Sequence, residues 1–347
     1  MRRRHVAAGG VAATLLLAGA QLVALVASLG GPDEADGPGD DVDGVTTGLA
    51  VGDGDVRSVV AYGGQGAWVD AYDFDPALGR PGRPPAIGPD DVGAMAEHRV
   101  DTLYLQGAMD RGQPDIGVAA PEQAGDLLRR AHEEGIRVVA WYLPRLGDLD
   151  RDVAFVEALD DFSSDGHRFD GLAIDIEWRE AVPDHEDRSA RVVELSERIR
   201  EVVGEDALGA IVPSPVHLEV VNTGFWPGFP WEELAPLYDA WMTMGYWTER
   251  RPESGLRHGY GYTAENVDRL RRLLDDEDAV VHPIGGIGSA VTPEDLAGYV
   301  DALTATDAVG GSVYDWATLA EPARAQLSQA LGAALEAEPE PPAPSDD

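Results

Sequence analysis

The chain contains neither cysteine nor lysine. Without cysteine it can form no disulfide and no thiolate metal site, and it has no cysteine nucleophile or lipid-anchored cysteine. All of its 26 basic residues are arginine, against 63 acidic residues, so the formal net charge is −37. Because so acidic a surface repels nucleic acids and anionic membranes, we expect neither as a partner.

Sequence patterns of several enzyme classes are missing as well. No glycine-rich fingerprint for a dinucleotide follows the first expected strand. Ser214 lies in a Val-Pro-Ser-Pro segment rather than in a nucleophile elbow. Neither His217 nor His282 has a partner at metal-ligand spacing. We therefore predict no serine hydrolase, no metal site and no cofactor.

The two ends of the chain differ from its middle. Residues 1–30 begin with three arginines and continue as an uncharged run rich in Ala, Leu and Val, which predicts a cleaved signal peptide or a retained membrane anchor. Either alternative places the rest at the cell surface or outside the cell, with membrane contact only through this segment. Residues 31–56 are rich in Gly and Asp, and residues 336–347 are acidic and rich in Pro. We expect a disordered linker and a disordered tail there.

Residues 57–335 alternate short apolar runs with longer amphipathic segments, which indicates repeated strand–helix units. Eight such units are the number and size typical of a (β/α)₈ TIM barrel, an α/β fold, and we expect it to be monomeric. A doubly wound open sheet is the alternative. The expected strands are 67–72, 102–106, 137–143, 171–177, 208–213, 240–244, 279–284 and 310–315. The helix after the sixth strand is expected to begin at a cap on Thr263.

The fourth expected strand, 171–177, carries two acidic residues at its C-terminal end. Asp175 and Glu177 are two residues apart, so they project from one face of a strand with Cα atoms roughly 6.5–7 Å apart. Neighbouring carboxylates raise each other's pKa, so one of them can keep a proton near neutral pH, as a general acid requires. The plain alternative is a strand end whose acids cap loops or pair with Arg179.

Polar and aromatic residues also follow the other strands. The active site of a TIM barrel lies at the C-terminal ends of its strands, so these residues are candidates for substrate binding. Aromatic rings and carboxylates dominate and cations are scarce, which favours a neutral sugar over a phosphorylated substrate. The candidates are Asp70, Gln106, Trp141, Met244, Trp247, Asp315 and Trp316, with Tyr246 as a catalytic candidate. The aromatic loop 225–231 is either a lid over the site or a hydrophobic plug.

The fourth strand resembles a known signature. The segment Phe169-Asp170-Gly171-x-x-x-Asp175-x-Glu177 is similar to the D-G-x-D-x-D-x-E motif of the family-18 glycoside hydrolases, the chitinase-like group. Ala173 departs from it, because it stands where the family has its innermost acid.

Two further segments are similar to the family in a looser way. Residues 238–246 resemble its sixth strand, with Met244 in place of a Tyr for which Tyr246 is the nearest substitute. Residues 310–316 resemble its eighth strand, whose tryptophan, here Trp316, forms the floor of the sugar site.

The resemblance implies hydrolysis of a β-linked, N-acetylglucosamine-containing polysaccharide by a substrate-assisted retaining mechanism. Glu177 would protonate the leaving oxygen, and Asp175 would orient the acetamido group whose carbonyl attacks the anomeric carbon. Three alternatives remain open. They are a catalytically degenerate barrel that still binds glycans, a lysozyme-like barrel of the family-25 type that attacks peptidoglycan, and a two-carboxylate scheme in which Asp70, Glu249 or Asp315 is the partner of Glu177.

Overall fold

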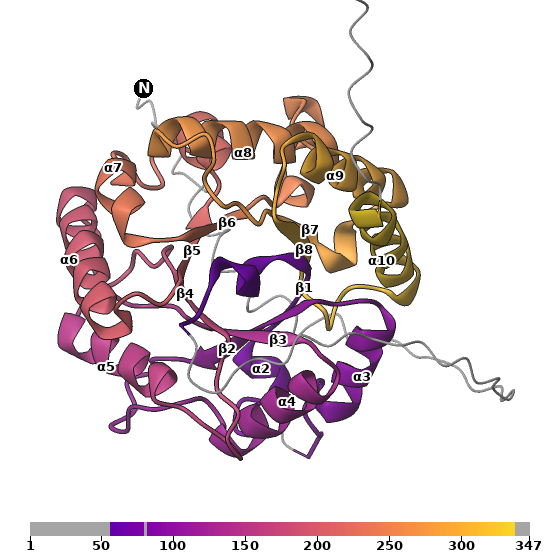
Figure 1. Cartoon of the computed structure of the whole chain (residues 1–347). Helices are drawn as coiled ribbons and strands as arrows, with labels where there is room; N and C mark the ends of the chain where they lie inside the picture. The colour runs from indigo at the N-terminus through magenta and orange to yellow at the C-terminus, as the bar shows by residue number, and fades with distance from the viewer. Residues whose placement is uncertain (1–55, 80–81, 337–347) are drawn as a thin grey trace, which may run out of the picture. The chain divides into compact units, whose positions relative to one another are not determined.

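Eight parallel strands close into a barrel, and each pairs with its neighbours in chain order. The computed structural model describes residues 56–79 and 82–336. Figure 1 shows the strands as an inner ring with helices around it. The strands are β1 (Gly64–Val69), β2 (Thr102–Ala108), β3 (Arg137–Tyr142), β4 (Gly171–Asp175), β5 (Leu208–Pro213), β6 (Ala240–Met244), β7 (Ile284–Ile287) and β8 (Gly310–Tyr314). The prediction of a TIM barrel is confirmed, and the open sheet is excluded.

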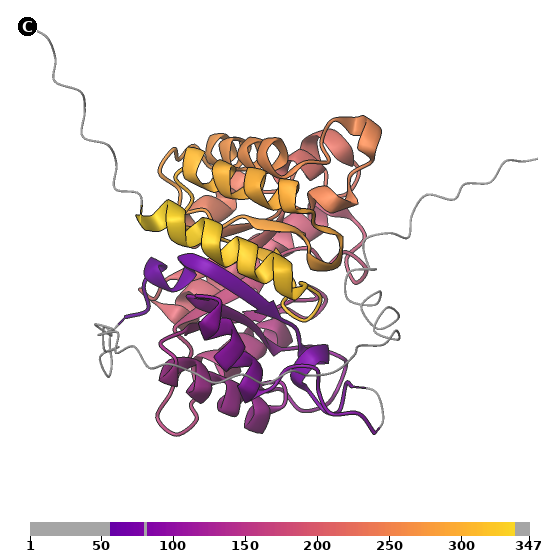
Figure 2. The same ribbon diagram turned by 90° about the vertical axis from the view of Figure 1, so that its right-hand side faces the viewer.

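Helices cover the outside of the barrel and alternate with the strands. They are α2 (Ala71–Phe74), α3 (Pro89–Glu97), α4 (Pro121–Glu133), α5 (Leu149–Asp160), α6 (His185–Val203), α7 (Trp231–Leu234), α8 (Gly259–Leu274), α9 (Pro293–Ala305) and α10 (Glu321–Glu336). In Figure 2 the yellow helix α10 lies beside the indigo β1, where β1 pairs with β8 and closes the barrel. Only short helical segments connect β5 to β6, namely the π-helical turn His217–Val221, α7 and a 3₁₀ turn at Ala235–Leu237.

Polar residues define where several of these helices begin. Asp184 accepts hydrogen bonds from the backbone amides of Glu186 and Asp187, and Thr292 accepts one from Asp295 at the start of α9. Such caps satisfy amides that have no partner inside a helix, so they fix the first turn. The expected cap on Thr263 is wrong. α8 begins four residues earlier, where His258 accepts a hydrogen bond from the Gly261 amide.

β1 and β7 differ most from their expected bounds, while β2, β3, β4 and β8 differ by one or two residues at their C-terminal ends. β1 lies three residues nearer the N-terminus than predicted, because the glycine-rich segment 64–66 forms its first half. β7 was expected at 279–284 but spans Ile284–Ile287. Pro283 has no amide hydrogen to donate to the ladder, so the earlier residues form only an isolated bridge, Trp241 with Val281.

The N-terminal end of the barrel is filled by Tyr62, from the 3₁₀ turn η1 (Val59–Tyr62). Its hydroxyl donates to the carbonyl oxygens of Leu172 and Ala207, 2.7 and 3.0 Å away, so it ties β4 to the start of β5. Arg57 forms ion pairs with Asp160 and Asp206 and holds the chain that enters this turn. A packed end of this kind leaves the C-terminal end of the strands for a site.

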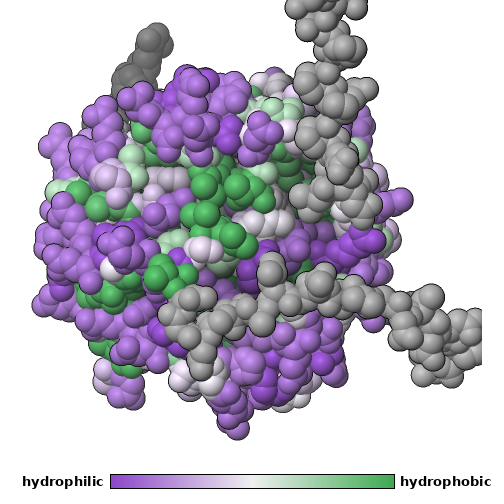
Figure 3. Space-filling model, in the orientation of Figure 1, coloured by the Kyte–Doolittle hydropathy of each residue, from purple (hydrophilic) through white to green (hydrophobic). Residues whose placement is uncertain are grey.

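The outer surface is mostly polar, as the net charge requires. Figure 3 shows apolar side chains gathered near the centre of one face, with polar side chains around them. Within the part of the chain that the structure describes, no helix is both long enough and apolar enough to span a bilayer. The predicted export segment, linker and most of the tail lie outside the described residues, so those expectations stay predictions.

Candidate functional site

Asp175 and Glu177, here called the β4 acid pair, lie at the C-terminal end of β4. Asp175 is the last residue of the strand, and Glu177 is in the turn that follows. The amide of Ile176 donates to the carbonyl oxygen of Ile211 at 2.8 Å, so the backbone stays fixed to β5 beyond the end of the strand. This bond holds the two carboxyls at the mouth of the barrel.

Burial raises the pKa of both members of the β4 acid pair. Burial raises the pKa of Glu177 to about 7, and the charge of Arg179, which lowers this pKa, has a smaller effect. Burial, and then the charge of Glu177, raise the pKa of Asp175 well above its usual value. Two coupled carboxyls with raised pKa values keep a proton between them near neutral pH. One of them can therefore act as an acid at that pH.

Polar atoms of this pair are free for a ligand. The Oδ1 atom of Asp175 is buried and has no hydrogen-bond partner within the described part of the chain. A buried carboxylate oxygen without a partner carries an energetic cost that a bound N–H or O–H group would remove. Glu177 is half-buried, and no hydrogen bond contributes to its shifted pKa. Both groups are therefore available to a substrate.

Ala173 explains why Asp175 has so little support from the protein. Its side chain is 1% exposed and belongs to an apolar layer inside the barrel with Trp141, Ile211 and Met242. An acid at this position would place a second polar group below Asp175. The methyl group instead leaves Asp175 above an apolar floor, which disfavours its charged form.

Tyr246 lies near the acid pair and next to a second tyrosine, Tyr314. Tyr246, just after β6, and Tyr314, the last residue of β8, have ring centroids 6.0 Å apart. Burial and the charges of Glu177, Asp175 and Asp315 raise the pKa of Tyr246 well above its usual value. Tyr246 is therefore within electrostatic reach of the β4 acid pair, as its predicted catalytic role requires, and it stays a neutral hydrogen-bond donor.

A second acidic group, here called the β1–β8 acid cluster, consists of Asp70, Asp73 and Asp315. Burial is the main reason that the pKa of Asp70 rises to about 6 and that of Asp73 to about 8, and the charge of Asp315 adds to both shifts. The Oδ1 atom of Asp70 accepts from the amide of Tyr72, and its Oδ2 atom from the hydroxyl of Tyr314. Asp315 accepts from the amide of Thr318 at 2.9 Å.

Two predicted tryptophans do not line the barrel mouth. Trp247 is fully buried and packs on Tyr299 of α9 at a centroid distance of 5.3 Å. Trp316 is 2% exposed and lies near His98 at the end of α3, with the Arg324 guanidinium 4.1 Å from its ring centroid. Both rings therefore pack between the barrel and its helices. The expected role of Trp316 as the floor of a sugar site is wrong.

The other predicted binding residues are placed in different ways. Trp141 and Met244 contribute to the apolar interior of the barrel, and Trp141 meets the ring of Trp68 edge-on at 6.1 Å. Gln106 is 3% exposed, and its Oε1 atom accepts from the amide of Ala71, so it holds the loop after β1. Glu249 is exposed in a 3₁₀ turn after β6.

The aromatic loop 225–231 is a plug rather than a lid. Phe225, Trp226, Phe229 and Trp231 are each at most 7% exposed and belong to the main hydrophobic core. The guanidinium of Arg188 in α6 lies over the Trp226 ring at 4.2 Å. A loop packed in this way is not free to open and close over a site.

Two residues near the site were missed by the sequence reasoning. Trp68 lies inside the barrel, stacked on Tyr104 at 4.4 Å with its Nε1 donating to Ser312. The displaced prediction of β1 placed Trp68 early in the strand and hid this position. Asp73 lies in the short helix α2 after β1, where no strand pattern indicates it.

The described residues include no group of three or more His, Asp or Glu side chains that could hold a metal ion. The titratable groups described at the mouth are carboxyls and phenols. With a protonated carboxyl beside an unpartnered carboxylate oxygen, the β4 acid pair can donate a proton and accept a hydrogen bond from the same ligand.

Comparison with solved structures shows the fold. A GH18 chitinase from Pseudoalteromonas aurantia matches with a TM-score of 0.54 at 11% identity, over 78% of this chain and 99% of that one. GH5_18 from Streptomyces cattleya, in complex with GlcNAc, matches with a TM-score of 0.58 at 13% identity over 83% of each chain. The spore cortex-lytic enzyme SleL of Bacillus megaterium QM B1551 matches with a TM-score of 0.53 at 10% identity, over 77% of this chain and 73% of that one.

Sequence comparison adds nothing further: no family model matches the chain, and no curated protein does. The structural matches establish that the chain has a TIM-barrel fold that solved chitinases share. At 10–13% identity they show the architecture alone.

Proposed function

We propose that this protein is an exported glycoside hydrolase that cleaves a β-linked, N-acetylglucosamine-containing polysaccharide, with Glu177 as its general acid. The observation that carries the proposal is the β4 acid pair itself. Burial raises the pKa of Glu177 to about 7, and the neighbouring Asp175 has a buried oxygen without a partner. Perturbed carboxyls at the C-terminal end of a barrel strand are what acid catalysis at neutral pH needs.

The proposed reaction uses these two groups in different ways. Glu177 gives its proton to the glycosidic oxygen as the bond to the anomeric carbon breaks. Asp175 accepts a hydrogen bond from the N–H of the sugar's acetamido group, whose carbonyl oxygen attacks the anomeric carbon. Attack by the acetamido oxygen closes an oxazolinium ring on the sugar. Water then attacks the anomeric carbon, which opens this ring, and gives a proton to Glu177. A positioned general acid contributes about 10²–10⁴ to the rate.

Three observations support a polysaccharide as the substrate. The group near the pair is the tyrosine Tyr246, whose ring lies 6.0 Å from that of Tyr314, and such phenols suit hydroxyls and sugar rings. The solved structures with this fold include chitinases, a cortex-lytic enzyme and a barrel bound to GlcNAc. An exported protein, as the N-terminal 30 residues predict, would meet such polymers outside the cell.

The proposal is tested by hydrolysis of solubilised chitin and of peptidoglycan by the full chain and by Glu177→Gln. Glu180→Gln is a matched control, because Glu180 is exposed three residues further along the same loop. We expect a loss of at least about a hundredfold in Glu177→Gln and near-parental activity in the control. Equal activity in all three proteins would show that Glu177 is not the acid.

A glycan-binding barrel without catalysis is the second candidate, and Ala173 favours it. Without an acid below Asp175, the apolar floor holds that carboxyl neutral, which weakens its ability to stabilise positive charge on the substrate. Retention on the polymers by the parent and by Glu177→Gln, with cleavage by neither, would establish this candidate.

A further inference from the structure

A cavity separate from the β4 acid pair lies between two loops at the same end of the barrel. Its volume is about 520 Å³, within the size range of small-molecule sites. Asp75 and Leu78, from the segment after α2, line one side. The loop that joins β2 to α4 lines the rest, with Arg111, Gln113, Asp115 and Ile116 among its residues.

The loop that forms most of this cavity is fixed by the rest of the fold. The guanidinium of Arg151 in α5 donates to the Asp110 carboxylate and to the carbonyl oxygen of Gln113, at 3.0 and 2.7 Å. The side chain of Gln113 spans the turn, accepting from the amide of Arg111 and donating to the carbonyl oxygen of Met109. The cavity is therefore largely formed before any ligand arrives, which lowers the entropic cost of binding.

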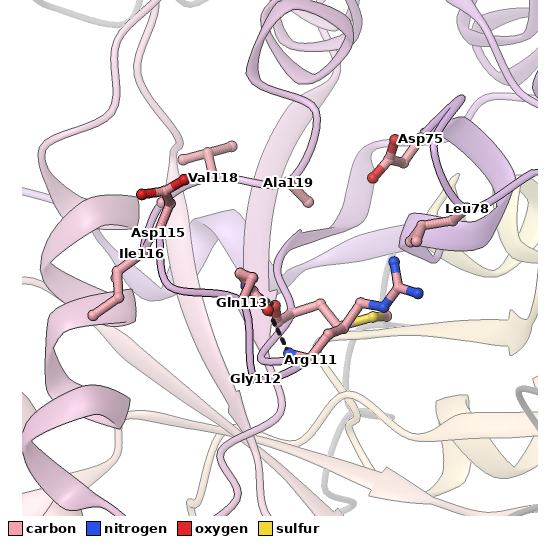
Figure 4. Close-up of a pocket in the computed structure, with 11 residues that line it drawn as sticks. Asp75, Leu78, Arg111, Gly112, Gln113, Asp115, Ile116, Val118 and Ala119 are labelled. Atoms are coloured by element: carbon pink, nitrogen blue, oxygen red, sulfur yellow. Dashed lines mark hydrogen bonds between the residues drawn. The ribbon is translucent and has the colours of Figure 1, made fainter.

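The charges on the cavity wall are separated from one another. Figure 4 shows the Arg111 guanidinium and the Asp75 carboxylate on one side, and Asp115 with Ile116 on the other. The hydrogen bond drawn in Figure 4 joins the backbone amide of Arg111 to the side chain of Gln113. The Arg111 guanidinium lines the cavity and has no carboxylate partner in the described structure. Among the described residues that line the cavity, Arg111 is the cation and Asp75 and Asp115 are the anions.

This pattern selects a class of ligand. A simple anion would gain from Arg111 but would be repelled by the two carboxylates, and by the net charge of −37. A group with both a carboxylate and N–H donors satisfies all three side chains, since Arg binds carboxylates in a fork and Asp accepts from N–H. Leu78 and Ile116 add apolar contact for short aliphatic side chains.

We propose that this cavity binds a peptide substituent carried by the glycan, so that the substrate is a peptide-bearing polysaccharide of the peptidoglycan type. The inference rests on the proposed function for the position of the glycan across the barrel mouth. β2 is two positions from β4 in the barrel, roughly 10 Å at ordinary strand spacing. A substituent on a sugar near the cleaved bond can therefore reach the cavity beyond β2.

The test measures the affinity of the full chain in its Glu177→Gln form, which prevents turnover. The probes are a peptidoglycan tetrasaccharide with its peptides, the same tetrasaccharide after enzymatic removal of the peptides, and chitotetraose. Titration calorimetry is expected to show binding about tenfold tighter for the peptide-bearing probe, as for one charge-assisted contact in a partly exposed site. Adding Arg111→Gln should bring the three probes to within about twofold of one another.

A matched control keeps the result specific to the cavity. Arg251→Gln removes the same charge from an exposed arginine after β6 that does not line the cavity, and it should preserve the preference for the peptide-bearing probe. Equal binding of the three probes, or a preference that survives Arg111→Gln, would overturn the inference.

The two proposals fail in different ways. Hydrolysis of the polymers by the parent, without any peptide preference, would leave the proposed function standing and remove the inference. A peptide preference lost in Arg111→Gln, in a parent that cleaves nothing, would keep the cavity as a binding site in a non-catalytic barrel.

Discussion

The two acidic groups at the mouth of the barrel have similar electrostatics but different bonding. In the β4 acid pair and in the β1–β8 acid cluster alike, burial is the main cause of the raised pKa values. Asp70 and Asp315 in the cluster, however, accept hydrogen bonds from loop amides. Asp175 in the pair has a buried oxygen with no partner in the described residues, and within the cluster Asp73 has one too.

This difference separates a residue that organises loops from a residue that is free to bind a ligand. Asp70 accepts from the amide of Tyr72 in α2 and from the hydroxyl of Tyr314, so it organises the loops after β1 and β8. Its lone pairs are used by the protein. Asp175 has unused hydrogen-bonding capacity at the C-terminal end of a strand, and a ligand is the group that can use it. A raised pKa alone would not have distinguished Asp70 from Asp175.

The largest effect beyond Glu177 itself is expected at Asp175. Asp175→Asn keeps the shape of the side chain but cannot become negative as positive charge develops on the substrate, so kcat should fall about 10²-fold. The melting temperature should stay close to that of the parent, because the changed atom has no partner in the described structure. Steady-state kinetics with a soluble oligosaccharide measure the first value and calorimetry the second. Asp70→Asn, by contrast, should lower the melting temperature more than kcat.

The proton on Glu177 predicts a pH dependence. The acid must be protonated to act, and its pKa in the folded protein is about 7. The value of kcat/KM should therefore be highest below that pH and fall about tenfold per pH unit above it. A profile that stays flat from pH 6 to pH 9 would contradict the assignment.

Tyr246 should have a smaller effect. Its hydroxyl is a neutral donor within electrostatic reach of Glu177 and Asp175, so Tyr246→Phe removes one hydrogen bond to the substrate or to the pair. We expect kcat/KM to fall about tenfold. Tyr314→Phe is the paired control. Its hydroxyl already donates to Asp70, so stability should change more than turnover.

Asp73 gives the corresponding prediction for stability. Its folded pKa of about 8 lies above its unfolded value, so the folded state holds a proton that the unfolded state releases between about pH 4 and pH 8. The free energy of unfolding should therefore decrease as the pH rises through this window. Asp73→Asn should increase it by about 1–3 kcal/mol at pH 8 and leave it little changed at pH 4. Denaturant unfolding at the two pH values measures the difference, and an equal effect at both would exclude this origin.

The smallest effect on activity is expected at Trp316. Because its ring packs between α3 and α10, Trp316→Phe should cost about 1–2 kcal/mol of stability and change kcat/KM by less than about twofold. A large rise in KM without loss of stability would contradict this placement and show that Trp316 contacts the sugar.

The sequence was sufficient for the barrel and for Asp175 at the end of β4, for physical reasons. Eight alternating units leave few topologies, and the alternation along 171–175 identifies the strand that ends at Asp175. Glu177 lies in the turn beyond this strand, so the period of two does not set its direction. The same rule fails at strand ends. Trp247 begins the 3₁₀ turn after β6, where alternation no longer holds, and its ring packs on Tyr299 of α9. After Tyr314 the chain leaves the ladder and turns at Asp315, so alternation no longer predicts where Trp316 points.

Other features of the site depend on contacts that no local pattern contains. Gln106 holds the loop after β1 through a partner far away in sequence. The loop 225–231 is likewise packed in the core by contacts with distant residues. The pKa values of Asp70 and Asp73 likewise depend on Asp315, which comes from the other end of the chain. Only the folded barrel brings these groups together.

The most direct test of Glu177 as the acid compares two leaving groups. The parent and Glu177→Gln would be assayed on a soluble N-acetylglucosamine oligomer and on the 2,4-dinitrophenyl glycoside of the same sugar, whose leaving group needs no proton. The account predicts a loss of at least about a hundredfold on the oligomer and less than about tenfold on the dinitrophenyl glycoside. Equal losses on both substrates would contradict it, because Glu177 would then serve a step other than protonation of the leaving oxygen.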